Sequence, residues 1–127
     1  MNNIQEQNTL KWVEAMLSGN YKHGKRVLIN LSTGCHCALG VAVVTQGLPY
    51  EGGRVTFPNG FKAISVVSPS WFDQTFGLPR DQAVYSALND HSKNYLGVCA
   101  LLLNALPESI RRNKLQRKMK AQSYVMA

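Results

Sequence analysis

The chain has 127 residues, of which 45% are apolar and 17% charged, with a formal net charge of +7 and a pI near 9.6. This composition excludes a disordered chain and favours one globular domain with its own core. The charge favours an acidic partner over a basic one. Three cysteines and a polar start without an apolar leader predict a cytoplasmic protein with free thiols, and no apolar run is long enough to span a membrane.

An apolar stripe at helical spacing predicts a first helix near the N-terminus. We expect it to start after Asn8 or Thr9 as the cap and to end at Gly19. The order of residues 1–7 stays open, and this stretch can be disordered. Residues 26–31 are rich in β-prone side chains and predict a strand. The stripe itself consists of Leu10, Val13 and Leu17.

The centre of the chain predicts a buried segment followed by a hairpin. Residues 37–45 form a continuous apolar run, which suits a buried strand or a buried helix because it shows neither period. Residues 54–57 and 61–67 are β-prone and flank an Asn59-Gly60 turn. This pattern predicts an antiparallel hairpin.

The second half of the chain is predicted to be helical. Ser68 as cap and Pro69 at the first position start a short helix, which Gly77 ends. Residues 80–88 predict another helix. Ser92 is the expected cap of a third, residues 93–104, which is apolar almost all round and therefore central.

A basic helix over residues 107–122 is expected to close the fold, and the order of residues 123–127 stays open. The elements together predict an α+β fold: residues 1–127 form a single, mostly helical domain with a small antiparallel sheet and a basic C-terminal helix.

Positive charge gathers in the last 21 residues of the chain. Six of the 14 Lys and Arg residues lie there, against one acidic residue, Glu108. A solvated helix usually mixes both signs, so this excess of one sign favours a phosphate-binding surface over a merely soluble one. The candidate phosphate ligands are Arg111, Arg112, Lys114, Arg117 and Lys118.

Aromatic side chains can supply a stacking face for a nucleotide base beside these cations, although most aromatic residues are expected in the core. The stacking candidates are Trp71, Phe72 and Tyr95. Asn89 is either a polar contact for the ligand or part of a cap for the buried helix at residues 93–104.

Catalytic and metal-binding patterns are weak. Cys35-His36-Cys37 contains metal-ligand residue types, but a structural zinc site needs a second, well-spaced ligand pair, and none follows. The carboxylates are scattered, and no phosphate-binding glycine loop is present. We therefore expect no enzyme activity, no metal and no cofactor.

Three short motifs in this chain resemble those of a family of small phage and prophage proteins. The family pattern runs Trp-x2-Ala-Leu-x-Ser-Gly-x-Tyr, then Cys-Cys-Leu-Gly-Val, then Leu-Asn-Asp. The likeness covers roughly residues 10–105 and implies a phage or prophage origin, without supplying catalytic residues. The chain departs from the pattern at His23, where the family has Gln, and at Ala38, where the family has its second Cys. The matching residues are Trp12, Ala15, Leu17, Ser18, Gly19, Tyr21, Cys37, Leu39, Gly40, Val41, Leu88, Asn89 and Asp90.

The combined expectation is a non-catalytic phage accessory protein that binds an anionic, nucleotide-like molecule. Its role would resemble that of the sponge proteins by which phages sequester nucleotide signals of host defence, and a homo-oligomer would close the pocket. The alternative is an interaction protein whose basic helix docks on nucleic acid, or on an acidic host protein that it inhibits.

Overall fold

The computed structural model describes residues 1–126 and has an α+β fold that is mostly helical, as expected. The described helices are α1 (Asn3–Leu17), α2 (Ala38–Thr45), α3 (Pro69–Phe76), α4 (Gln82–Asp90), α5 (Leu96–Ala105) and α6 (Ile110–Met126). The strands are β1 (Lys22–His23), β2 (Ile29–Asn30), β3 (Cys35–His36), β4 (Tyr50–Glu51), β5 (Arg54–Thr56) and β6 (Lys62–Ala63).

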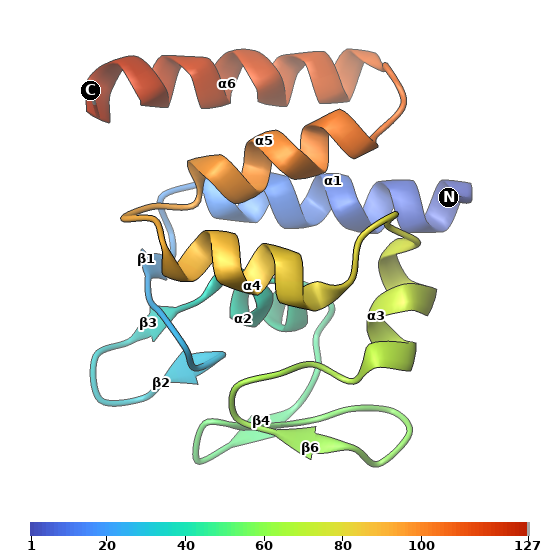
Figure 1. Ribbon diagram of the computed structural model, residues 1–127, viewed down its shortest axis with the longest axis vertical. Helices are drawn as coiled ribbons and strands as arrows, with labels where there is room; N and C mark the ends of the chain where they lie inside the picture. The colour runs from blue at the N-terminus through green and yellow to red at the C-terminus, as the bar shows by residue number, and fades with distance from the viewer. Residues whose placement is uncertain (127) are drawn as a thin grey trace.

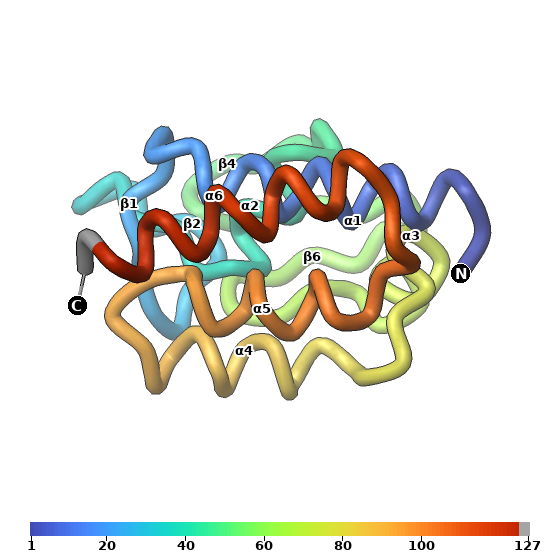
Figure 2. The backbone as a smooth tube through the Cα atoms, turned by 90° about the horizontal axis from the view of Figure 1, so that it is seen from above, coloured from blue at the N-terminus to red at the C-terminus, as the bar shows by residue number. Residues whose placement is uncertain are grey.

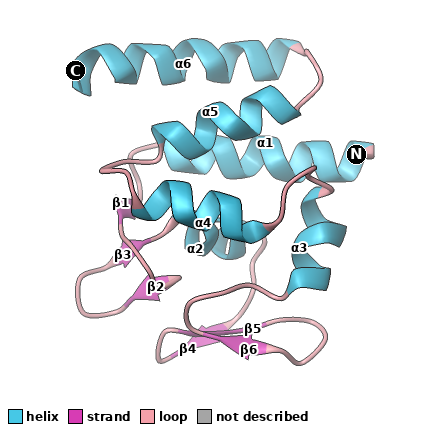
Figure 3. Ribbon diagram, viewed as in Figure 1, coloured by secondary structure: helices cyan, strands magenta, loops and turns pink. Residues whose placement is uncertain are grey.

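The helices and the strands occupy different sides of one domain (Figure 3). Helix α1 is central and packs against α2, α3, α5 and α6. Helix α6 lies on top and runs in the same direction as α1, with α5 next to it (Figures 1 and 2). The first sheet has the order β1-β3-β2 with a parallel and an antiparallel pair, and the second has the antiparallel order β4-β5-β6.

Helix α1 begins at Asn3, well before the expected start after Asn8 or Thr9. Asn2 and Gln5 form a capping box, which satisfies the first amide groups of the helix. The Gln5 side chain also donates to the carbonyl of Gln74 at the end of α3. Residues 3–7 are therefore helical and tied to the domain, in contrast to the open expectation for residues 1–7.

The ambiguous apolar run is helix α2, which is buried on all sides from Ala38 to Val43. Gly40 is required there because a Cβ atom at this position would overlap the carbonyl oxygen of Leu28. The Trp12 indole of α1 donates to the Ala38 carbonyl at 2.8 Å. These contacts place α2 in the centre of the core, where a helix satisfies its own backbone hydrogen bonds.

Several predicted elements are present with different bounds. The strand expected at residues 26–31 is only Ile29–Asn30: residues 26–28 bend, with a left-handed φ of 71° at Arg26, and residues 31–34 form a turn. The hairpin is present, but its second strand is Lys62–Ala63. Ser92 does not cap α5, which starts at Leu96; its hydroxyl donates to the Leu88 carbonyl at the end of α4.

Helix α6 spans Ile110–Met126 and is therefore later and longer than the predicted residues 107–122. Leu115 is buried and Met119 is half-buried against the rest of the domain. Residues 123–126, whose order was left open, are helical; Ala127 lies outside the described residues. Over residues 1–126, no helix combines the length and the apolar character needed to cross a membrane.

Candidate anion-binding site

The basic side chains of α6 point in different directions instead of forming one patch. Arg112 turns toward α5, whereas Arg117 and Lys120 are exposed. The other basic side chains of α6 face α1 and line a hollow of about 600 Å³, which we call the α1–α6 groove. The residues lining the groove are Glu14, Ser18, Arg111, Lys114, Leu115 and Lys118.

Arg111 is held by the opposite wall of the groove. Its Nη1 donates to Oε1 of Gln7 at 2.9 Å, and its Nη2 lies 3.4 Å from Oε2 of Glu14. The two charged side chains are 41% and 56% exposed, so the pair contributes little to stability. Glu14 nevertheless places one negative charge among the positive charges of the groove.

Lys114 and Lys118 are exposed on the same side of α6. Among the described residues, no carboxylate lies within 4 Å of either ammonium group. Both long side chains can therefore reach into the groove and contact an anion without first breaking an ion pair. Of the predicted phosphate ligands, these two and Arg111 are brought together by the fold.

Arg112 has a structural role, and the expected phosphate contact is not supported by its position. Its Nε donates to the carbonyl of Leu103 at 3.0 Å, and its Nη1 donates to Oδ1 of Asn113 at 3.2 Å. Leu103 lies in the last turn of α5, where its carbonyl also accepts from the Leu106 amide at 3.2 Å. Arg112 therefore caps α5 and joins it to α6.

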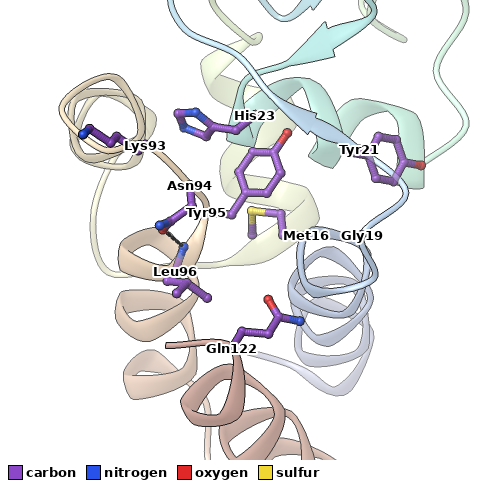
Figure 4. A pocket seen from close by; sticks show the side chains of 9 residues that line it. All are labelled: Met16, Gly19, Tyr21, His23, Lys93, Asn94, Tyr95, Leu96 and Gln122. Atoms are coloured by element: carbon purple, nitrogen blue, oxygen red, sulfur yellow. Dashed lines mark hydrogen bonds between the residues drawn. The ribbon is translucent and has the colours of Figure 1, made fainter. Parts of the chain in front are cut away.

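A second hollow, the aromatic hollow, lies between the end of α1, β1 and the start of α5 (Figure 4). Its volume is about 290 Å³. The Tyr95 ring meets the His23 ring edge to face, with the centroids 5.1 Å apart. The lining residues are Met16, Gly19, Tyr21, His23, Lys93, Asn94, Tyr95, Leu96 and Gln122.

Polar groups fix the rings of this hollow. The Tyr95 hydroxyl donates toward the carbonyls of His36 and Lys22, at 2.6 and 3.0 Å, and burial raises the pKa of this hydroxyl. His23 Nε2 lies 3.1 Å from the carbonyl of Asn89, which can only accept, so Nε2 carries the hydrogen. The ring positions are therefore set by the protein before any ligand binds.

The groove and the hollow are neighbours along the seam between α1 and α6. Just after α1, Ser18 lines the groove and Gly19, the next residue, lines the hollow. On α6 they meet at Lys118 and Gln122, one helical turn apart. Gln122 Nε2 donates to the Leu17 carbonyl at 2.7 Å and so marks the border between them.

Trp71 and Phe72 lie in the core, and their buried rings contradict the predicted stacking role. Their side chains are only 8% and 1% exposed. Phe72 packs against Trp12 and Phe76, and Trp71 packs against Phe57 and Phe76. Tyr95 is also buried, at 6% exposed, so its exposure does not support the predicted stacking role either, but it does line the aromatic hollow.

Asn89 is fully buried and its side chain is used by the fold, so it is not available to a ligand. Its Oδ1 accepts from the amide of Ala38 at 3.1 Å, and its Nδ2 donates to the carbonyl of Gly24 at 2.9 Å. Asn89 thus caps α2, whose own cap residue Cys37 makes no side-chain bond. The expectation that it contributes to capping the following helix is also wrong.

The cysteines and histidines do not form a recognisable reactive site. Burial raises the pKa of the Cys37 thiol to about 11 and that of Cys99 to about 12, which disfavours the nucleophilic thiolate. Over the described part of the chain, no three His, Cys, Asp or Glu residues are grouped to hold a metal ion.

Several residues of the two hollows were not singled out from the sequence. Glu14 lies on the exposed side of α1, and Gln122 is a polar residue near the end of a basic helix. Nothing in their local sequence marks them, because their proximity results from the packing of α1 against α6.

The chain matches no protein-family model, and searches of curated proteins and of solved structures found no match either.

Proposed function

We propose that the protein binds an anionic, nucleotide-type ligand, with phosphate in the α1–α6 groove and a ring in the aromatic hollow. The observation that carries this proposal is that the two hollows are neighbours: Ser18 of the groove precedes Gly19 of the hollow in the chain, and Lys118 lies one helical turn before Gln122. A ligand with a charged part and a flat part needs such an adjoining pair of surfaces.

Charge supports the assignment of the two parts. The groove carries the side chains of Arg111, Lys114 and Lys118 against the single carboxylate of Glu14. Lysine ammonium and arginine guanidinium groups bind phosphate oxygens through charge-assisted hydrogen bonds. The hollow has Tyr21 and Tyr95 in its wall and a volume near the lower end of small-molecule pockets, about 300 Å³, which suits one ring system.

The biological role that we propose is stoichiometric capture, not turnover. The resemblance to small phage proteins suggests sequestration of a nucleotide signal of host defence in the cytoplasm of an infected bacterium. The groove is open to solvent along α6, so tight capture needs a cover. We propose that a second copy supplies it in a homo-oligomer.

Native mass spectrometry of the protein purified from bacterial cells, before and after heat release, tests this proposal. We expect an oligomer with a releasable mass of nucleotide size. Lys114→Ala with Lys118→Ala should abolish that mass. Arg117→Ala with Lys120→Ala removes the same charge outside the groove and should retain it. A monomer that stays empty and binds no added nucleotide would overturn the proposal.

A second candidate function is supported by the exposed cations outside the groove. Arg117 and Lys120 do not line it and are open to solvent. They favour docking of α6 on nucleic acid or on an acidic host protein. The same variants discriminate, because under this alternative Arg117→Ala with Lys120→Ala loses the partner.

A further inference from the structure

We propose that the ligand is the end of a single-stranded oligonucleotide: the terminal base enters the aromatic hollow and the next phosphates follow the groove over Lys118, Lys114 and Arg111. This inference rests on the proposed function and names the ligand class for the same site. It follows from the spacing of the cations, from the size of the hollow and from the place of Glu14.

The residues that carry the cations follow one another along α6, so their backbone positions form a row beside the groove. Lys114 and Lys118 are four residues apart on α6, about 6 Å along the axis, and Arg111 lies about 4.5 Å before Lys114. The diphosphate of a single nucleotide needs donors that converge on one place. A row that extends over about 10 Å instead suits phosphates separated by sugars.

The aromatic hollow accepts one unpaired base. Its volume of about 290 Å³ suits one ring system, and it is walled by β1 on one side and by residues 93–96 on another (Figure 4). A base stacked there cannot keep its pairing partner. Stacking on aromatic side chains combined with a basic track along the backbone is the general way in which proteins hold single strands.

Glu14 limits the contribution of the third phosphate. A phosphate that binds Arg111 competes with the Glu14 carboxylate, which lies 3.4 Å from Nη2. The first two phosphates, at Lys118 and Lys114, meet no such competitor within the described residues. We therefore expect a large gain in affinity for each of the first two phosphates and a smaller gain for the third.

Oligodeoxyadenylates and oligothymidylates with one to five phosphates, measured by fluorescence anisotropy over a range of salt, test the inference. Affinity should rise up to three phosphates and then stay constant. The slope of log affinity against log salt should steepen by about 0.7 for each phosphate, to about 2 at the plateau.

Three variants assign these effects to residues. Lys118→Ala should lower the slope by about 0.7, whereas Lys120→Ala, an exposed cation outside the groove, should leave it unchanged. Glu14→Gln should raise the affinity for three phosphates about two- to fivefold and leave that for one phosphate unchanged.

The outcomes separate this inference from the proposed function. A nucleoside monophosphate or triphosphate that binds as tightly as the three-phosphate strand overturns the oligonucleotide and leaves nucleotide binding intact. A duplex that binds as tightly as a single strand overturns it in favour of docking on the outer face of α6. Failure of every nucleotide and oligonucleotide to bind overturns both proposals.

Discussion

Asn89 shows how one buried side chain can hold three segments together. Its amide connects α4 to Ala38 at the start of α2 and to Gly24 after β1. We expect Asn89→Ala to lower the free energy of unfolding by about 2–3 kcal/mol, because it leaves the buried Ala38 amide and the part-buried Gly24 carbonyl without this partner. Urea denaturation measures the change. The exposed variant Lys93→Ala is the control, and a loss below about 0.5 kcal/mol for Asn89→Ala would contradict the capping role.

Two helical glycines give a matched pair of opposite predictions. A Cβ atom at Gly40 would overlap the Leu28 backbone, whereas one at Gly97 would meet only the Leu88 side chain at 3.4 Å. Gly40→Ala should therefore destabilise the fold by more than about 3 kcal/mol. Gly97→Ala should be neutral or stabilising by up to about 1 kcal/mol, because alanine favours helix. Thermal unfolding of both variants checks this, and equal melting temperatures would refute the packing of α2 described above.

At the level of elements, the α5–α6 junction separates Arg112, which has a structural role, from Lys114, which we propose binds the ligand. Arg112→Ala removes the hydrogen bond to the Leu103 carbonyl, and we expect a loss of about 1–2 kcal/mol in unfolding free energy. Anion binding and its salt dependence should stay unchanged. Lys114→Ala should weaken anion binding and its salt dependence and leave the free energy of unfolding unchanged. Denaturation and phosphate-ligand titrations of both variants measure this, and an effect of Arg112→Ala on the salt slope would contradict the assignment.

Elements with local start and stop residues were predictable from the sequence. Helix α3 has Ser68 as cap, Pro69 at its first position and a left-handed Gly77 at its end, all as expected. Helix α2 was ambiguous because its cap comes from Asn89, 51 residues away. The early start of α1 was missed because its first turn is polar and only the Asn2–Gln5 capping box marks it.

The candidate site was predictable only in part, for a similar reason. The excess of cations on α6 is visible in the sequence, but which of them share a groove depends on α1, whose Glu14 is 97 residues before Arg111. The stacking role predicted for Trp71 and Phe72 was wrong because the same residue types pack in a core and stack on a base, so the sequence does not distinguish the two roles.

For the molecule as a whole, the buried thiols couple stability to pH. The pKa values of Cys37 and Cys99 are raised by burial to about 11 and about 12, so the unfolded chain loses these protons at lower pH than the folded one. Stability is therefore full below about pH 8.5, the ordinary thiol pKa, and falls above it by up to about 1.4 kcal/mol per pH unit for each thiol. Urea denaturation at pH 7.5 and 10 checks this. Cys37→Ala with Cys99→Ala should flatten the profile, and an unchanged slope would contradict it.

The position of the groove between α1 and α6 also links its occupancy to local unfolding of α6. Helix α6 is held by a small buried contact through Leu115 and Met119, so we expect its amide hydrogens to exchange through opening of α6 alone. Opening removes one wall of the groove, so any molecule bound there must slow this exchange in proportion to its occupancy. Hydrogen exchange should then show that the protection of the α6 amides increases with the concentration of the bound molecule. The exchange rates of the amides in the buried helix α2 should stay unchanged. A molecule that fills the groove would thereby lengthen the time for which this surface helix stays docked.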